Sequence, residues 1–281
     1  MSIEKYNNRA RKINSLLCVG LDPDFEKIPD RFKKLEFPQF EFSKWIMGET
    51  HEYASSYKTN SAFYEARGVE GMKELKMTID FINKNYPDIF TILDAKRADI
   101  GNTNNGYVTY VFDWLGFDSV TLHPYLGSEA LEPFLKRTDK GSIILCRTSN
   151  PGARELQDLK VQHSSVGLAN VLGSWPILFS KPLWQIVAEK VSKDWNKNNN
   201  CLLVVGATYP KEMKKIRQIA GDMTFLVPGI GAQGGDLQAV MKNGLNSEGL
   251  GLLISSTREI IFSQNPKEEA GKLCEEIRKY K

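Results

Sequence analysis

Residues 90–123 read FTILDAKRADIGNTNNGYVTYVFDWLGFDSVTLH, and they contain one complete unit of the fold. The short apolar runs Phe90–Leu93 and Ser119–His123 predict two buried strands. Residues 104–116, which lie between them, have the apolar spacing of a helix. A strand, a helix and a second strand in this order are typical of parallel strands joined by a crossover helix.

The alternation of strand and helix continues along the whole chain. Further strands are expected at Ser15–Gly20, Tyr53–Lys58, Ser142–Cys146, Cys201–Val205, Thr224–Val227 and Leu250–Ile254. Further helices are expected at 40–50, 68–85, 128–137, 182–197, 210–220, 235–243 and 266–280. The resulting eight units suit a closed barrel, which commonly needs about 250 residues, better than an open sheet. We therefore expect residues 1–281 to form a single α/β domain, a (β/α)8 TIM barrel.

Two segments lie outside the eightfold pattern. The residues before Ser15 predict an added N-terminal helix over the floor of the barrel. Residues 150–181, after the fifth strand, are too many for an ordinary strand-to-helix loop. Because they contain SNPGA and the apolar stretch LANVLGSWPILF, we expect an ordered insertion near the strand ends.

The composition restricts the class of protein. Hydrophobic residues make up 41% of the chain and charged residues 25%, which is typical of a globular protein. The net charge of +3, without a concentrated basic tract, gives little support for a nucleic-acid partner. The start, MSIEKYNNRARK, lacks the apolar core of a secretory signal, and no apolar run approaches the ~20 residues that cross a membrane. Four cysteines without a CxxC pair predict free thiols and a reducing, cytoplasmic location.

Charged residues cluster after the third expected strand, in the stretch TILDAKRADIGNT. Side chains alternate along a strand, so Asp94 and Lys96 share one face, and Asp99 follows where the chain turns. Lys58 ends the neighbouring second strand, and in TIM barrels the carboxyl ends of the strands carry the chemistry. An isolated DxKxxD match is more simply a structural ion cluster. The nearby Lys58 instead favours an array in which two lysines and two aspartates alternate.

Other strand ends also carry polar residues. Asn60 follows Lys58 by two positions and is expected on the same side. Asp22, in VGLDPD, is either a site residue or only a turn residue before a proline. His123 is more simply a hydrogen-bonded structural group than a general base. Because the three histidines are scattered, the sequence predicts neither a histidine metal site nor a Ser-His-Asp triad.

Two segments near the C-terminus suggest an anion site. The seventh strand is followed by VPGIGAQGGD, whose glycines free the backbone to approach a ligand before a helix begins. The eighth strand ends in LLISSTRE, which contains Arg258. TIM barrels often bind phosphate between the loops that follow these two strands. A glycine-rich turn alone could be only a turn, but together with Arg258 it predicts phosphate binding.

Taken together, the motifs resemble those of the orotidine 5′-phosphate decarboxylase family. The matching stretches are VGLDPD, YKTNSAFYE, LDAKRADIGNT, RTSNPGA, PGIGAQGGD and ISSTRE, in this order between Val19 and Glu259. The DAKRADIGNT wording and the insertion after strand five are similar to a longer subgroup of the family. The resemblance implies conversion of orotidine monophosphate (OMP) to UMP and CO2, in pyrimidine biosynthesis, with neither a metal nor an organic cofactor.

The resemblance also implies roles for individual residues. The implied catalytic residues form a charged tetrad: Lys58, Asp94, Lys96 and Asp99. The implied substrate-binding residues are Asp22 for the ribose, Ser149 for the pyrimidine, Gln233 and Arg258 for the phosphate, and Asn60 and Thr103 as further contacts. Lys96 would protonate C6 of the pyrimidine as the carboxylate departs. In the family the sites lie at the interface of a homodimer, so Asp99 and Thr103 would reach into the neighbour's pocket.

Two alternatives remain open at this point. Sugar-phosphate decarboxylases and hexulose-phosphate synthases share DxKxxD, but they resemble metal enzymes with an acidic ligand at the end of strand two. This chain has Lys58 there, and a lysine would repel magnesium. A non-catalytic barrel that binds a phosphate ligand is the other alternative, since a fold does not determine a function. Such a binder has no need of two inward-facing lysines.

Overall fold

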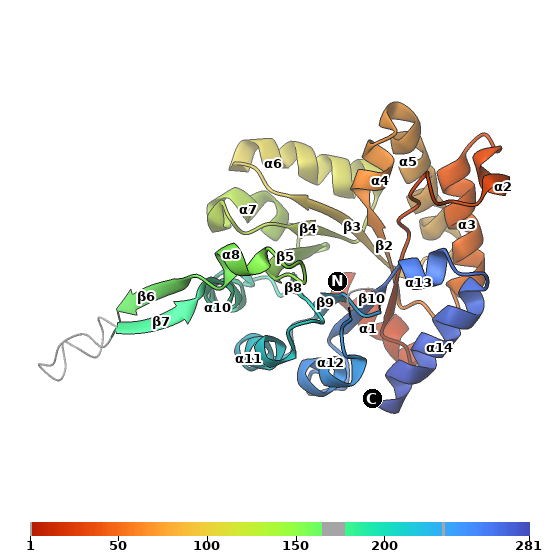
Figure 1. Ribbon diagram of the computed structural model, residues 1–281. Coiled ribbons are helices and arrows are strands. Elements are labelled where there is room, and N and C mark those ends of the chain that lie inside the picture. The colour runs from red at the N-terminus through yellow and green to blue at the C-terminus, as the bar shows by residue number, and fades with distance from the viewer. Residues whose placement is uncertain (1, 165–177, 232–233) are drawn as a thin grey trace, which may run out of the picture.

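Eight parallel strands close into a barrel in the computed structural model, which describes residues 2–164, 178–231 and 234–281 (Figure 1). Around the barrel the strands follow the order β1-β10-β9-β8-β5-β4-β3-β2. Their bounds are β1 Leu17–Gly20, β2 Ser56–Asn60, β3 Phe90–Arg97, β4 Ser119–Leu122, β5 Gly141–Arg147, β8 Cys201–Val205, β9 Phe225–Pro228 and β10 Leu252–Ser256. The expected (β/α)8 architecture is confirmed.

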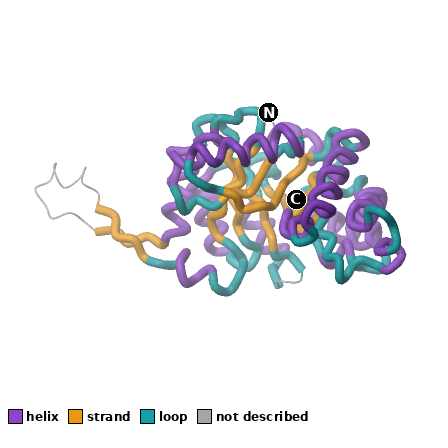
Figure 2. Tube along the Cα trace, turned by 90° about the horizontal axis from the view of Figure 1, so that it is seen from above, coloured by secondary structure: helices purple, strands orange, loops and turns teal. Residues whose placement is uncertain are grey.

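Helices follow the strands and cover the outside of the barrel (Figures 1 and 2). The α-helices are α1 Ser2–Lys12, α2 Asp30–Lys33, α3 Pro38–Thr50, α4 Ser61–Glu65, α5 Gly68–Asn85, α6 Gly101–Val108, α7 Gly127–Leu135, α8 Ala153–Gln157, α10 Leu183–Lys190, α11 Pro210–Ala220, α12 Leu237–Gly244, α13 Arg258–Ile261 and α14 Pro266–Lys279. Two π-helical segments, η1 Thr109–Leu115 and η2 Val191–Trp195, continue α6 and α10.

Several elements differ from the sequence-based expectation, among them one strand and one helix near the site. Strand β2 begins at Ser56 rather than at Tyr53, because the N–H of Tyr53 donates to the carbonyl oxygen of Thr50 and extends the turn after α3. The helix expected at 104–116 is regular only in its first half, and its second half winds as the π-helix Thr109–Leu115. Neither difference changes the order of elements around the barrel.

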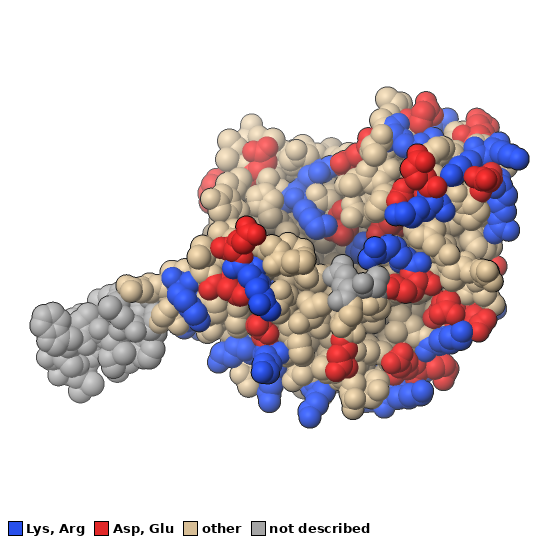
Figure 3. Space-filling view, in the orientation of Figure 1, with Lys and Arg blue, Asp and Glu red and all other residues tan. Residues whose placement is uncertain are grey.

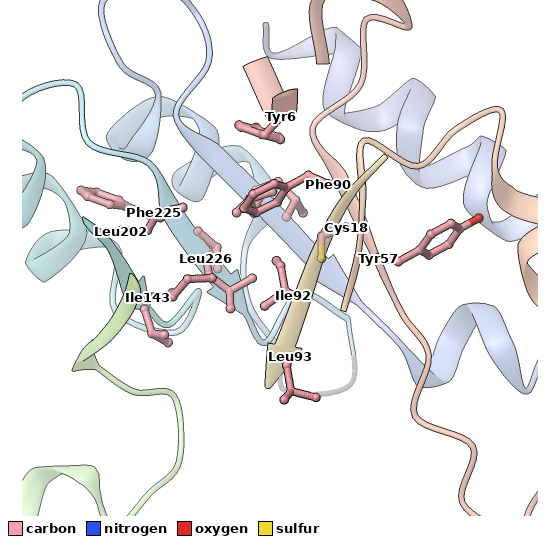
Figure 4. Packing of buried hydrophobic residues seen from close by; sticks show 14 of the residues in the cluster. Tyr6, Cys18, Tyr57, Phe90, Ile92, Leu93, Ile143, Leu202, Phe225 and Leu226 are labelled. Carbon is pink, nitrogen blue, oxygen red and sulfur yellow. The ribbon is translucent and has the colours of Figure 1, made fainter. Parts of the chain in front are cut away.

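The core is built from alternate residues of the strands. Ile92 and Leu226 point toward the barrel centre, whereas Tyr57 points outward (Figure 4). The hydroxyl of Tyr57 lies 3.0 Å from the hydroxyl of Thr50 in the covering helix α3. This alternation turns Ser56, Lys58 and Asn60 inward, so only the last residues of β2 bring polar groups to the open end.

The N-terminal helix closes the opposite end of the barrel. Tyr6 of α1 is buried, donates a hydrogen bond to the carbonyl oxygen of Leu252, and packs its ring 6.1 Å from that of Phe90. Leu252 and Phe90 are the first residues of their strands. The expected helix over the barrel floor is therefore confirmed.

The insertion after β5 contains the short helix α8 and an antiparallel pair of strands, β6 Lys160–Ser164 and β7 Leu178–Pro182. This hairpin projects sideways from the barrel (Figures 1 and 2). Most of the apolar stretch LANVLGSWPILF lies in 165–177, outside the described residues. For the described part, the expected insertion is confirmed.

All four cysteines, Cys18, Cys146, Cys201 and Cys274, are free and buried, as the sequence predicted. Burial raises the pKa of the Cys18 thiol to about 11 and those of Cys146 and Cys201 to about 12. These three thiols are therefore protonated near neutral pH. Among the described residues, no helix combines the length and the apolar character that crossing a membrane requires.

Candidate active site

A cavity of about 690 Å³ opens at the carboxyl ends of the strands. In the view of Figure 3 this end of the barrel is hollowed, with acidic and basic side chains around the hollow. Seven of the residues singled out in the sequence line it: Asp22, Lys58, Asn60, Asp94, Lys96, Ser149 and Arg258. The closed barrel thus brings together residues from five strand ends.

Lysines and aspartates alternate along one wall of the cavity. Lys58 Nζ lies 3.4 Å from Oδ2 of Asp22 and 3.5 Å from Oδ2 of Asp94. Lys96 Nζ lies 2.7 Å from Oδ1 of Asp94. Three members of the expected array, Lys58, Asp94 and Lys96, therefore lie together. Within one chain, however, its second aspartate is Asp22 and not Asp99.

The two lysines differ in their surroundings. The side chain of Lys58 is 7% exposed and that of Lys96 is 49% exposed. Burial by itself would lower the pKa of Lys58, but the carboxylates of Asp22 and Asp94 outweigh it, so the pKa lies above its ordinary value. Lys58 is thus a permanent buried cation, whereas Lys96 reaches into the cavity where a ligand would lie.

Asp94 is held ionised by its neighbours. Burial would raise the pKa of this carboxyl, but Lys58, Lys96 and a hydrogen bond from Thr121 lower the pKa to about 2. The hydroxyl of Thr121 donates to Oδ1 of Asp94 at 2.8 Å. Asp94 is therefore a fixed negative charge between two cations at any pH near neutrality.

A local distortion of β3 directs Lys96 into the cavity. The backbone of Lys96 has φ +47°, and the pairing of β3 with β4 shifts register between Leu93 and Arg97. A positive φ is uncommon for a residue other than glycine and costs of order 1 kcal/mol or more. The N–H of Lys96 donates to the hydroxyl of Thr121 at 2.9 Å, so Thr121 holds both this bend and Asp94.

Asp99 and Thr103 do not line the cavity of their own chain. Oδ1 of Asp99 accepts a hydrogen bond from the N–H of Ile100 at 2.7 Å, and the N–H of Asp99 donates to Oδ1 of Asn104 at 3.0 Å. Thr103 lies in a separate groove between α5 and α6, together with Arg97. Both residues therefore lie outside the cavity formed by their own chain.

Asn60 and Ser149 are held by contacts between neighbouring strand ends. Asn60 caps α4 by accepting from the N–H of Ala62 at 3.1 Å, and its own N–H donates to Oδ1 of Asp22 at 3.0 Å. Ser149 lies so close to Gly206 that a Cβ at position 206 would be 2.9 Å from the Ser149 backbone. Only glycine allows this approach of the loops after β5 and β8.

The resemblance implies two phosphate-binding residues, Gln233 and Arg258. Arg258 is exposed at the start of α13 and lines the cavity. Gln233 lies outside the described residues. On the described side of that loop, Gly231 has φ +79°, a left-handed conformation that favours glycine.

Several residues that line the cavity carry no recognisable signal in the sequence. Thr121 on β4 gives no functional signal in the sequence, because a threonine in a short buried strand normally indicates packing alone. Gln157 lies in the insertion, where its Nε2 donates to the Thr148 hydroxyl at 2.8 Å and its Oε1 accepts from the Thr148 N–H at 3.0 Å. His123 does not line the cavity, and its Nε2 lies 3.2 Å from the carbonyl oxygen of Ala98. The structural interpretation of His123 is therefore confirmed.

Across residues 2–164, 178–231 and 234–281, no three or more His, Cys, Asp or Glu side chains are grouped so that they could hold a metal ion. At the end of β2, where the alternative sugar-phosphate enzymes would place an acidic ligand, the structure has the buried Lys58.

Known proteins are similar to this chain in sequence and in fold. Residues 15–172 match the model of the family described as "Orotidine 5′-phosphate decarboxylase / HUMPS family". Over 265 residues the chain is 46% identical to the orotidine 5′-phosphate decarboxylase of Cellvibrio japonicus, covering 94% of this chain and 90% of that protein. The chain belongs to the orotidine 5′-phosphate decarboxylase family.

Further members of this family agree along nearly the full length. The orotidine 5′-phosphate decarboxylase of Flavobacterium johnsoniae is 43% identical over 279 residues, covering 99% of this chain and 95% of that protein. The structure of Leishmania donovani OMP decarboxylase superposes with a TM-score of 0.84 at 37% identity, covering 99% of this chain and 98% of that one. The similarity to these decarboxylases therefore covers nearly the whole chain, including the segments that line the cavity.

Proposed function

We propose that the cavity converts OMP to UMP and CO2, and that Lys96 is the proton donor. The activity follows from membership of the decarboxylase family. The observation that carries the role of Lys96 is the position of its ammonium group. It reaches into the cavity 2.7 Å from Asp94 Oδ1, while the buried Lys58 supports the same carboxylate from behind.

The chemistry of the reaction calls for such a cation. When the bond from C6 to the carboxylate carbon breaks, CO2 departs and the electron pair stays on C6, in the plane of the ring. The ring cannot delocalise this pair as an enolate, so a nearby positive charge must stabilise it. Lys96 supplies that charge and then transfers a proton to C6, giving UMP and a neutral amine that regains its proton from solvent.

The other residues position the substrate around this step. Asp22 accepts hydrogen bonds from ribose hydroxyls, Ser149 contacts the pyrimidine, and Asn60 lies beside the ribose. Arg258, with Gln233, binds the phosphate far from the reacting carbon. Binding energy from that phosphate is then available to position the ring over Lys96. Asp94 lies beside the substrate carboxylate, a like-charge contact that CO2 loss relieves.

Asp99 and Thr103 act in the site of a second copy of the chain. Both are outside their own cavity. Thr103 and Met72 line the separate groove, and exposed apolar residues precede each of them by three positions in the chain. Val69 is 82% exposed and Ile100 is 63% exposed, as expected for residues that a partner subunit covers. The proposed assembly is a homodimer in which Asp99 of each subunit completes the tetrad of the other.

Further proposals concern the setting of the enzyme. The proposal that the chain belongs to a longer subgroup of the family is supported by the DAKRADIGNT motif and the β6–β7 hairpin. Free buried thiols suit a reducing cytoplasm, where the single barrel domain serves pyrimidine biosynthesis. The reaction as written involves neither a metal nor an organic cofactor, and neither nucleic acid nor a membrane as partner.

The direct test is an assay of purified protein with OMP in the presence of a strong chelator. We expect UMP and CO2 to form at the same rate with and without the chelator, because Lys96 provides both charge and proton. Turnover that requires added magnesium would favour the sugar-phosphate type of mechanism. Tight binding of OMP without turnover would indicate a barrel that only binds phosphate ligands.

A further inference from the structure

Two segments bring the ribose side of the array into place. The loop after β1 carries Asp22, Asn60 ends β2, and Phe63 lies in the short helix α4 that follows β2 directly; all three residues line the cavity. The two segments touch through the hydrogen bond from the Asn60 N–H to Asp22 Oδ1 at 3.0 Å. The distance from Asp22 to Lys58 therefore depends on how the β1 loop is held against the end of β2 and α4.

A buried amide behind the cavity wall joins these two segments. Gln39 in α3 is fully buried and does not line the cavity. Its Nε2 donates to the carbonyl oxygens of Pro23 and Phe63, each at 2.8 Å. Pro23 directly follows Asp22 in the chain, so one side-chain amide fixes the backbone beside Asp22 to the backbone of α4.

The orientation of this amide is itself determined. Oε1 of Gln39 accepts a hydrogen bond from Nη1 of Arg67 at 3.1 Å, which leaves Nε2 to face the two carbonyl groups. Nη1 of Arg67 also pairs with the buried carboxylate of Glu74, and Glu74 Oε2 accepts from the N–H of Phe40 at 2.9 Å. The network is thus anchored in α3 and α5, outside the site.

From this geometry we infer that Gln39 is a positioning residue that sets the place of Asp22 relative to Lys58. Without its amide the carbonyl oxygens of Pro23 and Phe63 would lack this partner in a buried region, and the β1 loop would separate from α4 to reach water. Asp22 would then no longer lie at the distance from Lys58 that suits the ribose. This inference rests on the proposed role of Asp22 in binding substrate.

A double-mutant cycle tests the inference. Gln39→Met keeps the volume of the side chain and removes the amide. We expect kcat/KM for OMP to fall at least about tenfold, mainly through KM, with a parallel rise in the Kd for UMP. In the Asp22→Ala background the same substitution should change kcat/KM by less than about twofold, because the group that it positions is gone.

A matched control separates positioning from general stability. Asn200, at the opposite end of the barrel, also uses its buried amide to donate to two backbone carbonyls, those of Leu135 and Arg137. Asn200→Leu should lower the melting temperature about as much as Gln39→Met, yet leave kcat/KM within about twofold of the parent in both backgrounds. If Gln39→Met does not fold, Gln39→Glu takes its place, since it keeps the shape and the oxygen that faces Arg67.

The outcomes are distinct. A loss of kcat/KM that is equally large with and without Asp22 would overturn the inference while leaving the proposed function intact. So would activity of the Gln39 variant within twofold of wild type. If Asp22→Ala by itself leaves kcat/KM unchanged, the proposed role of Asp22 fails, and the role of Gln39 fails with it.

Discussion

The ammonium group of Lys58 lies 3.5 Å from the carboxylate of Asp94, although the two residues are not paired across their strands. The register of β2 and β3 pairs Lys58 with Ile92 and Asp94 with Asn60. Asp94 lies two residues further along β3 than Ile92, and the long side chain of Lys58 covers that distance inside the barrel. Asp94 is therefore in contact with two lysines, the buried Lys58 and the more exposed Lys96.

This relationship has a consequence for stability at low pH. Asp94 has a pKa of about 2 in the folded protein, below its value in an unfolded chain. A depressed carboxyl pKa stabilises the fold above the unfolded pKa of about 3.9, and this contribution disappears as the pH falls through the folded pKa. We expect a loss of about 2 kcal/mol between pH 5 and pH 2 from this residue.

Comparison with Asp94→Asn isolates that contribution. Urea unfolding of both proteins from pH 5 to pH 2 should show a difference in unfolding free energy that shrinks with falling pH, since the protonated Asp94 resembles Asn. A difference that stays constant over this range would mean that Asp94 is not held ionised by its lysines.

Lys96→Ala should separate binding from catalysis. We expect the Kd for UMP to stay within about tenfold of wild type, whereas kcat falls by about 10³-fold or more, because general acid catalysis and charge stabilisation are both removed. Lys190→Ala is a suitable control, since Lys190 is 54% exposed, close to the 49% of Lys96, but lies on α10. Near-normal turnover of the Lys96 variant would place the proton donor elsewhere.

Arg258→Ala tests the phosphate end of the cavity. A charge-assisted contact of this kind contributes about 1.5–3 kcal/mol, so the affinity for UMP should fall about 10- to 100-fold. Binding of uridine, which lacks the phosphate, should be unchanged in titration calorimetry. Arg154→Ala removes another exposed arginine that does not line the cavity, and it should alter neither ligand. An equal loss for UMP and uridine would argue against a phosphate role.

Mixing subunits tests whether the sites are shared. Asp99→Ala and Lys58→Ala proteins should each be nearly inactive alone. In a mixed dimer one site contains both substitutions and the other contains neither, so random exchange should restore about a quarter of wild-type activity. The measurement is the rate of OMP turnover after refolding the two variants together. Verified mixed dimers without any recovery would show that Asp99 does not act across the interface.

The sequence by itself was sufficient for the barrel and for most of the charged array. Alternating strands and helices encode a local pattern, and the strand ends in a parallel barrel all meet at one mouth, so Lys58, Asp94 and Lys96 could be placed together from their positions alone. Motif spacing also indicated Arg258 for the phosphate.

Only the tertiary structure decided the rest, because those features depend on contacts between distant segments. The positive φ of Lys96 depends on Thr121 in the next strand, and the position of Asp99 outside its own cavity depends on how the chain turns into α6. Gln39 carries no recognisable motif. Its role arises only where packing of α3 against the barrel brings one buried amide between a carbonyl group of the β1 loop and one of α4.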